Sequence, residues 1–297
     1  MPRPRGARKC GLQIPVEIDA KLASLFAPLG RLIHVGRNEM NNQHEQNRAC
    51  WNSWADWWRK KADQRGTWQK CHRNPELVLS PAEMRFLNEV RGKNVCVLGS
   101  GDNEVVFALA GMGATVTSID ISEKQLEVAG ERAGILGLHV TFLRADVIDL
   151  SSIPDGRFDI VYTGGAVSIW ISDIAKYYAE AVRILRPGGL FIVHEYHPIR
   201  QMWLESDGPT PRHRYFNRGP YEYSTHTGLN QVEFHWTTAD HIQAVVDAGC
   251  TLVKVDEHGE REEKDEHAPF VPSTLPTYLI IVGRKEPSNS SDEPNAG

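Results

Sequence analysis

The hydrophobic pattern divides the chain into two parts with different periodicity. Over residues 14–91 apolar side chains recur at helical spacing. Within this part Trp51, Trp54 and Trp58 are three and four residues apart, which assigns them to one face of a helix. From Asn94 onward the pattern changes to short apolar runs separated by helical segments. The chain therefore predicts an N-terminal helical region followed by a domain of mixed strands and helices.

Seven apolar runs in the second part predict strands. Because they alternate with helical segments of about 10–15 residues, they indicate βαβ units and a parallel sheet. No helix of ordinary length separates the last two runs, which favours an antiparallel late strand. The prediction is an α/β fold with a seven-strand mixed sheet. The predicted strands are 94–99, 114–120, 139–146, 157–163, 190–196, 251–258 and 277–285, and the predicted helices are 103–111, 122–136, 172–185 and 237–248.

Breaks in the alternation predict the domain organisation. Residues 199–235 are rich in Pro, Gly, Tyr, His and Arg, and an insertion of this length is usually functional or disordered. Residues 1–11 and 286–297 contain few apolar side chains and are expected to be disordered tails. The helical region then covers 12–91 and the α/β domain covers 92–285.

Composition and charge narrow the class of protein. The 297 residues are 41% hydrophobic and 24% charged, which is typical of a globular protein. No apolar stretch approaches the roughly 18 residues of a membrane span, and no apolar segment of a secretory signal follows the basic start. A net charge of -5 gives no general attraction to nucleic acid. Five cysteines without metal-ligand spacing indicate reduced thiols in a cytoplasmic protein without a metal site.

The turns after the predicted strands carry the candidate chemistry, because α/β sheets bind ligands at the carboxyl ends of their strands. Gly99-Ser100-Gly101 follows the first strand and opens a helix, so its backbone can approach an anionic group closely. Asp120 ends the second strand, and its carboxylate suits the two hydroxyls of a ribose. Asp146 ends the third strand, where it suits an adenine amino group or an ordinary turn equally well.

Over about residues 92–285 the order of these motifs resembles the class I S-adenosylmethionine-dependent methyltransferases. Residues 158–163 resemble the fourth motif of that family, and Arg186-Pro187-Gly188-Gly189 resembles its turn before the fifth strand. The resemblance implies a Rossmann-like fold, an N-terminal helical lid over 12–91 and S-adenosyl-L-methionine as the cofactor. The implied cofactor-binding residues are Gly99, Ser100, Gly101, Asp120, Ile121, Gln125, Asp146, Val147, Thr163 and Gly164.

Two positions depart from the family pattern. Asn103 replaces the third glycine of the first motif, and Val97 stands where an acid often helps to hold the methionine ammonium. The methionine end of the cofactor is therefore expected to contact the backbone of Gly99, Thr163 or Gly164. These departures keep open a second interpretation, a non-catalytic protein that binds S-adenosylmethionine or S-adenosylhomocysteine.

Candidate catalytic residues follow the fifth predicted strand. Methyl transfer depends largely on positioning, and it needs a base only where the acceptor must lose a proton early. His194, Glu195, Tyr196 and His197 lie at the end of the strand that meets the ligand crevice. Either histidine is a candidate base, and Glu195 is a candidate for orienting the base or the substrate. Burial of alternate residues, with the others in an ordinary loop, explains the same pattern equally well.

The acceptor pocket is expected to be aromatic. A tryptophan face is more typical of a core than of a substrate cage. The implied lid nevertheless makes Trp57 and Trp58 candidates for one wall of the pocket, and Tyr221 of the insertion a candidate for the opposite wall.

The predicted function is methyl transfer to a small organic acceptor, at nitrogen, oxygen or carbon. The chain reads Thr-Gly-Gly-Ala after the fourth strand, not the N/D-P-P-Y motif of adenine and glutamine methylation. Nicotinamide-dependent oxidoreduction uses a similar glycine turn and acid, but the Arg-Pro-Gly-Gly turn and the antiparallel late strand disfavour it. The sequence carries no indication of an oligomeric state.

Overall fold

The structure is a computed structural model that describes residues 32–34, 42–101, 104–204, 206, 208–259, 272 and 274–287, with only the backbone for 32–34. The predicted tail 1–11, the start of the predicted helical region, Asn103 and residues 288–297 lie outside the described residues.

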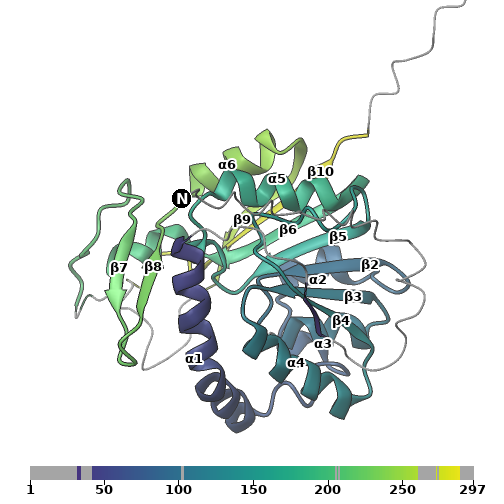
Figure 1. Cartoon of the computed structure of the whole chain (residues 1–297). Coiled ribbons are helices and arrows are strands. Elements are labelled where there is room, and N and C mark those ends of the chain that lie inside the picture. The colour runs from purple at the N-terminus through teal and green to yellow at the C-terminus, as the bar shows by residue number, and fades with distance from the viewer. Residues whose placement is uncertain are drawn as a thin grey trace, which may run out of the picture.

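A mixed eight-stranded sheet forms the centre of the fold, in the order β1-β4-β3-β2-β5-β6-β10-β9 (Figure 1). Neighbouring strands are parallel except β10, which runs antiparallel to both β6 and β9. This confirms the predicted seven-strand sheet with a late antiparallel strand. The strands are β1 (Leu32–His34), β2 (Asn94–Leu98), β3 (Thr115–Asp120), β4 (Val140–Arg144), β5 (Phe158–Gly164), β6 (Leu185–Tyr196), β9 (Cys250–His258) and β10 (Tyr278–Lys285).

The eighth strand corrects the prediction of an all-helical N-terminal region. β1 pairs in parallel with residues 142–144 of β4, at the edge of the sheet. Pairing gives the backbone N–H and C=O groups on the outer side of β4 their hydrogen-bond partners. A three-residue run is too short for its spacing to distinguish a strand from a helix.

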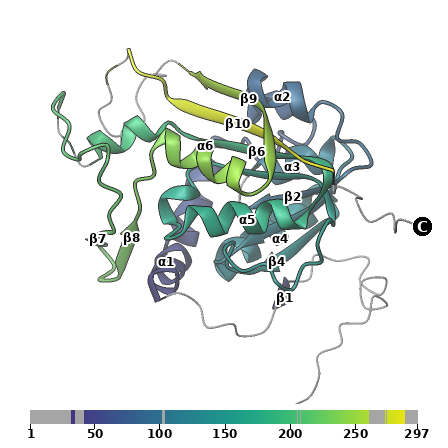
Figure 2. The ribbon, with the colours of Figure 1, turned by 90° about the horizontal axis from the view of Figure 1, so that it is seen from above.

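Helices cover both faces of the sheet. α5 and α6 lie side by side on one face (Figure 2), where Tyr177, Tyr178 and Val245 belong to one apolar core. α2, α3 and α4 enclose a second core on the other face. Phe142 and Leu143, neighbours on β4, enter different cores because successive strand residues point to opposite faces. The helices are α1 (Asn42–Arg65), α2 (Pro81–Leu87), α3 (Glu104–Gly111), α4 (Glu123–Leu136), α5 (Ile174–Ile184) and α6 (Thr238–Asp247). Among the described residues, no helix combines the length and the apolar composition needed to cross a bilayer.

The insertion at 199–235 contains regular structure and packs against the N-terminal helix. Its strands β7 (Tyr221–Ser224) and β8 (Asn230–Glu233) form an antiparallel hairpin beside α1 (Figure 1). The Asn47 side chain on α1 bonds both backbone groups of Val232: Nδ2 donates to its carbonyl at 2.8 Å, and Oδ1 accepts from its N–H at 2.8 Å. α1 and the hairpin therefore form one continuous wall. The remaining short helices are the 3-10 turns η1 (Pro75–Leu77), η2 (Ser168–Trp170) and η3 (Pro198–Trp203).

Candidate active site at the carboxyl ends of the parallel strands

The glycine turn after β2 adopts a backbone that only glycine accommodates easily. Gly99 has φ +61° and Gly101 has φ +49°. A Cβ at Gly99 would lie 2.4 Å from Cγ1 of Val167, so the turn and the segment after β5 approach each other closely. The Ser100 hydroxyl is buried and lies 2.6 Å from the Ser118 hydroxyl on β3. These contacts fix the turn against the neighbouring strands.

Asp120 is held at the end of β3 by two backbone donors. Gly101 N–H donates to Oδ2 at 2.7 Å, and Ser122 N–H donates to Oδ1 at 2.7 Å. Ser122 also caps α4, because its hydroxyl accepts from the N–H of Gln125 at 3.2 Å. The glycine turn, the acid and the start of α4 are thus one hydrogen-bonded unit.

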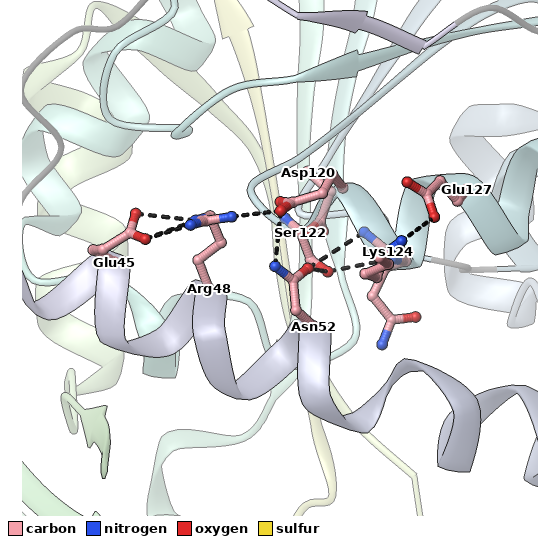
Figure 3. Close-up of polar contacts among 9 residues, drawn as sticks. Glu45, Arg48, Asn52, Asp120, Ser122, Lys124 and Glu127 are labelled. Carbon is pink, nitrogen blue, oxygen red and sulfur yellow. Dashed lines mark hydrogen bonds and ion pairs between the residues drawn. The ribbon is translucent and has the colours of Figure 1, made fainter. Parts of the chain in front are cut away.

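α1 is fastened to this unit by polar side chains (Figure 3). Asn52 Oδ1 accepts from the Ser122 hydroxyl at 2.7 Å, and Asn52 Nδ2 donates to Glu123 Oε1 at 3.0 Å. Arg48 also bonds Glu123, at 2.5 Å, and pairs with Glu45. Burial alone would raise the pKa of the Glu123 carboxyl, but the hydrogen bond from Arg48 holds it below its ordinary value. α1 therefore crosses the start of α4 beside Asp120.

Asp146, after β4, is bonded to a buried histidine of α1. His44 Nδ1 lies 2.7 Å from Asp146 Oδ2, and the exposed fraction of His44 is 1%. His44 Nε2 accepts from Ser172 N–H at 2.9 Å, so Nδ1 carries the proton and donates to the carboxylate. The second oxygen of Asp146 accepts from Ile148 N–H at 3.2 Å. The carboxylate is thereby fixed at the cavity.

These groups surround one cavity of about 350 Å³. It lies at the carboxyl ends of β2, β3, β4 and β5, as expected for ligand sites in α/β sheets. Trp51, Trp58 and Trp170 form an aromatic wall, and Tyr196 at the end of β6 adds a fourth ring. The Trp51 and Trp170 rings meet edge to face at 5.3 Å between centroids. The lining residues are His44, Asn47, Trp51, Trp58, Ala62, Arg65, Gly99, Ser100, Gly101, Glu104, Asp120, Ile121, Gln125, Asp146, Val147, Gly164, Gly165, Ala166, Val167, Trp170, Ile171 and Tyr196.

All predicted cofactor residues line this cavity except Thr163. Thr163 is completely buried, and its hydroxyl accepts a hydrogen bond from Tyr177 at 2.6 Å. It belongs to the core behind the cavity because the side chains of β5 alternate between the two faces of the sheet. Contact of the other residues with a cofactor stays a prediction.

Two of the predicted catalytic residues, His194 and His197, point to other partners and do not line the cavity. His194 Nδ1 lies 3.1 Å from Oε1 of Glu83, which is buried. His197 Nε2 lies 2.7 Å from Glu257 Oε1. Tyr196, between them in sequence, is the member of this group that lines the cavity. A catalytic role for either histidine therefore has no geometric support here.

Glu195 does not line the cavity either, but its carboxylate bonds the backbone of a segment that does. The carboxylate is 1% exposed and accepts from the backbone N–H groups of Val167 and Ser168, both at 3.2 Å. Burial raises its pKa to about 7. Because Val167 lines the cavity, the position of Glu195 fits a residue that orients the site more closely than a base.

Of the three residues predicted to contact the acceptor, one lines the cavity and two do not. Trp58 lines the cavity, whereas Trp57 is 45% exposed and contacts Trp58 edge-on. Tyr221 stacks on His235, with ring centroids 4.2 Å apart, and is not a lining residue.

Sequence reasoning missed most of the contribution of α1. The lining residues of this helix are His44, Asn47, Trp51, Trp58, Ala62 and Arg65. Successive members are three, four or seven residues apart, which is the spacing of one helical face. This stripe was the available signal, and the tryptophans mark only its middle.

Comparison with known proteins identifies the domain. Residues 97–193 match the family described as "Methyltransferase domain". The chain is 28% identical over 154 residues to a ubiquinone biosynthesis O-methyltransferase of Caulobacter sp. (strain K31), covering 47% of this chain and 57% of that protein. It is 32% identical over 123 residues to a demethylmenaquinone methyltransferase of Thermus thermophilus, covering 41% of this chain and 52% of that protein. The chain thus spans about half the length of the curated relatives that it matches.

The fold is shared with a smaller solved structure. The crystal structure of an S-adenosylmethionine-dependent methyltransferase from Mesorhizobium loti superposes with a TM-score of 0.54 at 26% identity, covering 69% of this chain and 99% of that one. The family match, the order of the strands in the sheet and the order of the motifs along the chain all indicate the same fold. Residues 97–193 therefore form a methyltransferase domain of the class I S-adenosylmethionine-dependent type.

Proposed function

We propose that this protein transfers a methyl group from S-adenosyl-L-methionine to a small organic acceptor. One observation carries the proposal: the glycine turn at 99–101, Asp120, Asp146 and Gly164 lie at the carboxyl ends of four adjacent parallel strands and border a single cavity. In this order they offer close backbone approach, an acceptor for ribose hydroxyls and an acceptor for an adenine amino group.

The donors and acceptors at the cavity fit an adenosine derivative. Gln125 lines the cavity, and its Oε1 is buried without a hydrogen-bond partner among the described residues. A buried orphan acceptor of this kind is costly, and a bound donor would satisfy it. Asp120 lines the cavity with a carboxylate whose two oxygens are oriented by backbone N–H groups, and a carboxylate suits the hydroxyls of a ribose.

When bound, S-adenosylmethionine would supply a sulfonium methyl group for in-line attack by an acceptor nucleophile, with S-adenosylhomocysteine as the leaving group. The residues of the chain would bind and orient the cofactor and the acceptor, and they would exclude water from the cavity. Asp120 and Asp146 anchor the nucleoside, and the rings of Trp51, Trp58 and Trp170 keep water from the reacting atoms. Aromatic faces also tolerate positive charge. Most of the expected rate enhancement is therefore positional.

Tyr196 is the residue that we assign to the acceptor. It lines the cavity at the end of β6, and the Arg200 guanidinium lies 3.9 Å from its ring centroid. Its ring also stacks on Tyr278, with centroids 5.4 Å apart. A ring held in this way presents its hydroxyl in a fixed position for hydrogen bonding to a substrate.

The acceptor is proposed to be small, and the protein to act in the cytoplasm. A net charge of -5 supports a small molecule over a nucleic acid. Cys50, Cys71, Cys96 and Cys250 are buried and free, as expected for a protein of a reducing compartment.

Calorimetric titration of the purified chain with S-adenosylmethionine, S-adenosylhomocysteine and NADH tests the proposal. Binding of the two sulfur nucleosides but not of NADH is expected, followed by methyl transfer in a screen of small acceptors with isotopically labelled cofactor. Failure of both sulfur nucleosides to bind at millimolar concentration would overturn it. Binding without turnover on any acceptor would point to a non-catalytic binding protein.

A further inference from the structure

Two opposite charges line the cavity beside the glycine turn. Arg65 is the last residue of α1, and Glu104 is the first residue of α3. Each charge sits at the helix end whose dipole favours it, a cation at a carboxyl end and an anion at an amino end. The segment after α1 contacts the start of α3, since the Cys71 thiol lies 3.5 Å from the Glu104 carbonyl oxygen.

Glu104 lies on the β2 side of the two carboxylates assigned to the nucleoside. Asp146 and Asp120 follow β4 and β3, whereas Glu104 follows the turn after β2, the next strand in the order β4-β3-β2. A ligand whose adenosine part contacts Asp146 and Asp120 would extend toward Gly101 and Glu104. The cavity thus has a nucleoside end and an end with one positive and one negative side chain.

The family's usual anion for this second end is absent. Val97 occupies the position of the acid that often helps to hold the methionine ammonium, and it is 1% exposed within an apolar core. A zwitterionic amino acid requires an anion for its ammonium and a cation or N–H donors for its carboxylate. Among the described lining residues, Glu104 and Arg65 are the Asp, Glu, Lys or Arg side chains that remain besides Asp120 and Asp146.

We propose that Glu104 binds the ammonium group and Arg65 the carboxylate of the cofactor's methionine end. Glu104 thereby takes the role of the acid that often stands at the position of Val97. This inference rests on the proposed function. It assigns a binding role to two residues that the motif pattern does not contain. The proposed carboxylate, Glu104, is seven residues after Val97 and lies at the start of α3 instead of near the end of β2.

Three ligands that differ only at this end test the assignment by calorimetry. S-adenosylhomocysteine carries both charges, its decarboxylated analogue keeps only the ammonium, and 5′-methylthioadenosine has neither. Glu104→Gln should weaken binding of the first two by about ten- to a hundredfold and leave 5′-methylthioadenosine within about twofold. Arg65→Gln should weaken S-adenosylhomocysteine alone by about tenfold or more.

Matched controls are available on α1 and α4. Arg59 lies on α1 in an ion pair with Glu131, and Glu127 is an exposed residue of α4; neither lines the cavity. Arg59→Gln and Glu127→Gln should bind all three ligands as the wild type does. Retained binding of 5′-methylthioadenosine also reports that the Glu104 and Arg65 variants are folded.

The outcomes separate this inference from the proposed function. Suppose that the wild type binds the ligands, and that the two variants either weaken the binding of all three ligands equally or weaken the binding of none. The assignment of Glu104 and Arg65 is then wrong, while the cofactor proposal stands. If the wild type binds none of the three ligands, the proposed function fails and the assignment fails with it.

Discussion

His44 Nδ1 donates to Asp146 Oδ2 at 2.7 Å and joins the first turn of α1 to the segment after β4. The other ring nitrogen accepts from Ser172 N–H at 2.9 Å, so a single neutral imidazole links three segments of the chain. Asp146 lines the cavity and is predicted to contact the adenine. The helix that covers the cavity therefore also orients one of its carboxylates.

Replacing His44 tests this link. His44→Ala removes the donor to Asp146 Oδ2 and the acceptor of the Ser172 N–H, at a cost of about 1–3 kcal/mol in the free energy of unfolding. S-adenosylhomocysteine affinity should fall by about five- to tenfold because the carboxylate loses its orientation. Chemical denaturation and calorimetry measure the two effects. His139 is exposed, and His139→Ala is the control; equal ligand affinity in both variants would contradict the link.

Asp120 should matter more for ligand binding than any other single carboxylate of the cavity. Asp120→Ala removes the acceptor for the ribose and also leaves the N–H groups of Gly101 and Ser122 without their partner. We expect S-adenosylhomocysteine affinity to fall about a hundredfold, and Asp120→Asn to fall between wild type and alanine because the amide keeps one acceptor oxygen. Asp247 on α6 is exposed, and its alanine variant should bind as wild type. An Asp120→Ala affinity within twofold of wild type would be inconsistent with a ribose contact.

The sequence predicted the sheet and its turns because these features are local. A run of buried residues followed by a glycine turn or an acid can be recognised without knowing its neighbours, and Gly99 and Asp120 were found in this way. β1 was missed because its partner in the sheet, β4, is more than a hundred residues away. Three residues carry no periodicity of their own.

The polar residues of α1 could not be assigned for a related reason. His44 and Asn47 look like ordinary surface residues of a helix, and their burial depends on Ser172 and Val232, which are 128 and 185 residues away. The residues at the end of β6 show a similar limit. Alternation assigns His194 and Tyr196 to the same face of the sheet, but it does not reveal that Tyr196 lines the cavity and His194 does not.

The close approach of Gly99 to Val167 gives a steric prediction. In Gly99→Ala the new Cβ would lie 2.4 Å from Val167 Cγ1, and the residue would also have to keep φ +61°. We expect a loss of about 2–4 kcal/mol in the free energy of unfolding, measured by denaturant titration. Val167→Ala removes both clashing methyl groups, so the double variant should recover part of the loss but not the part due to φ. Simple additivity of the two single variants would show that the contact is not responsible.

Glu195 provides the last prediction, because burial raises its pKa from 4.5 to about 7. An acid with a higher pKa in the folded state binds its proton more tightly there, so its contribution to stability is present at low pH and is lost as pH rises from about 4.5 to 7. Glu195→Gln is neutral throughout and keeps an acceptor oxygen for the Val167 and Ser168 N–H groups. The free energy of unfolding of the wild type relative to this variant should therefore fall by about 2–3 kcal/mol over that range and stay constant above it. Denaturant titrations between pH 4 and pH 8 measure the difference, and the exposed Glu222 gives the control Glu222→Gln.

S-adenosylhomocysteine affinity should survive in Glu195→Gln but fall in Glu195→Ala, since only the amide still holds the cavity wall at Val167. A difference in stability that rose with pH, or equal loss of affinity in both variants, would instead indicate that the ionised carboxylate itself is required.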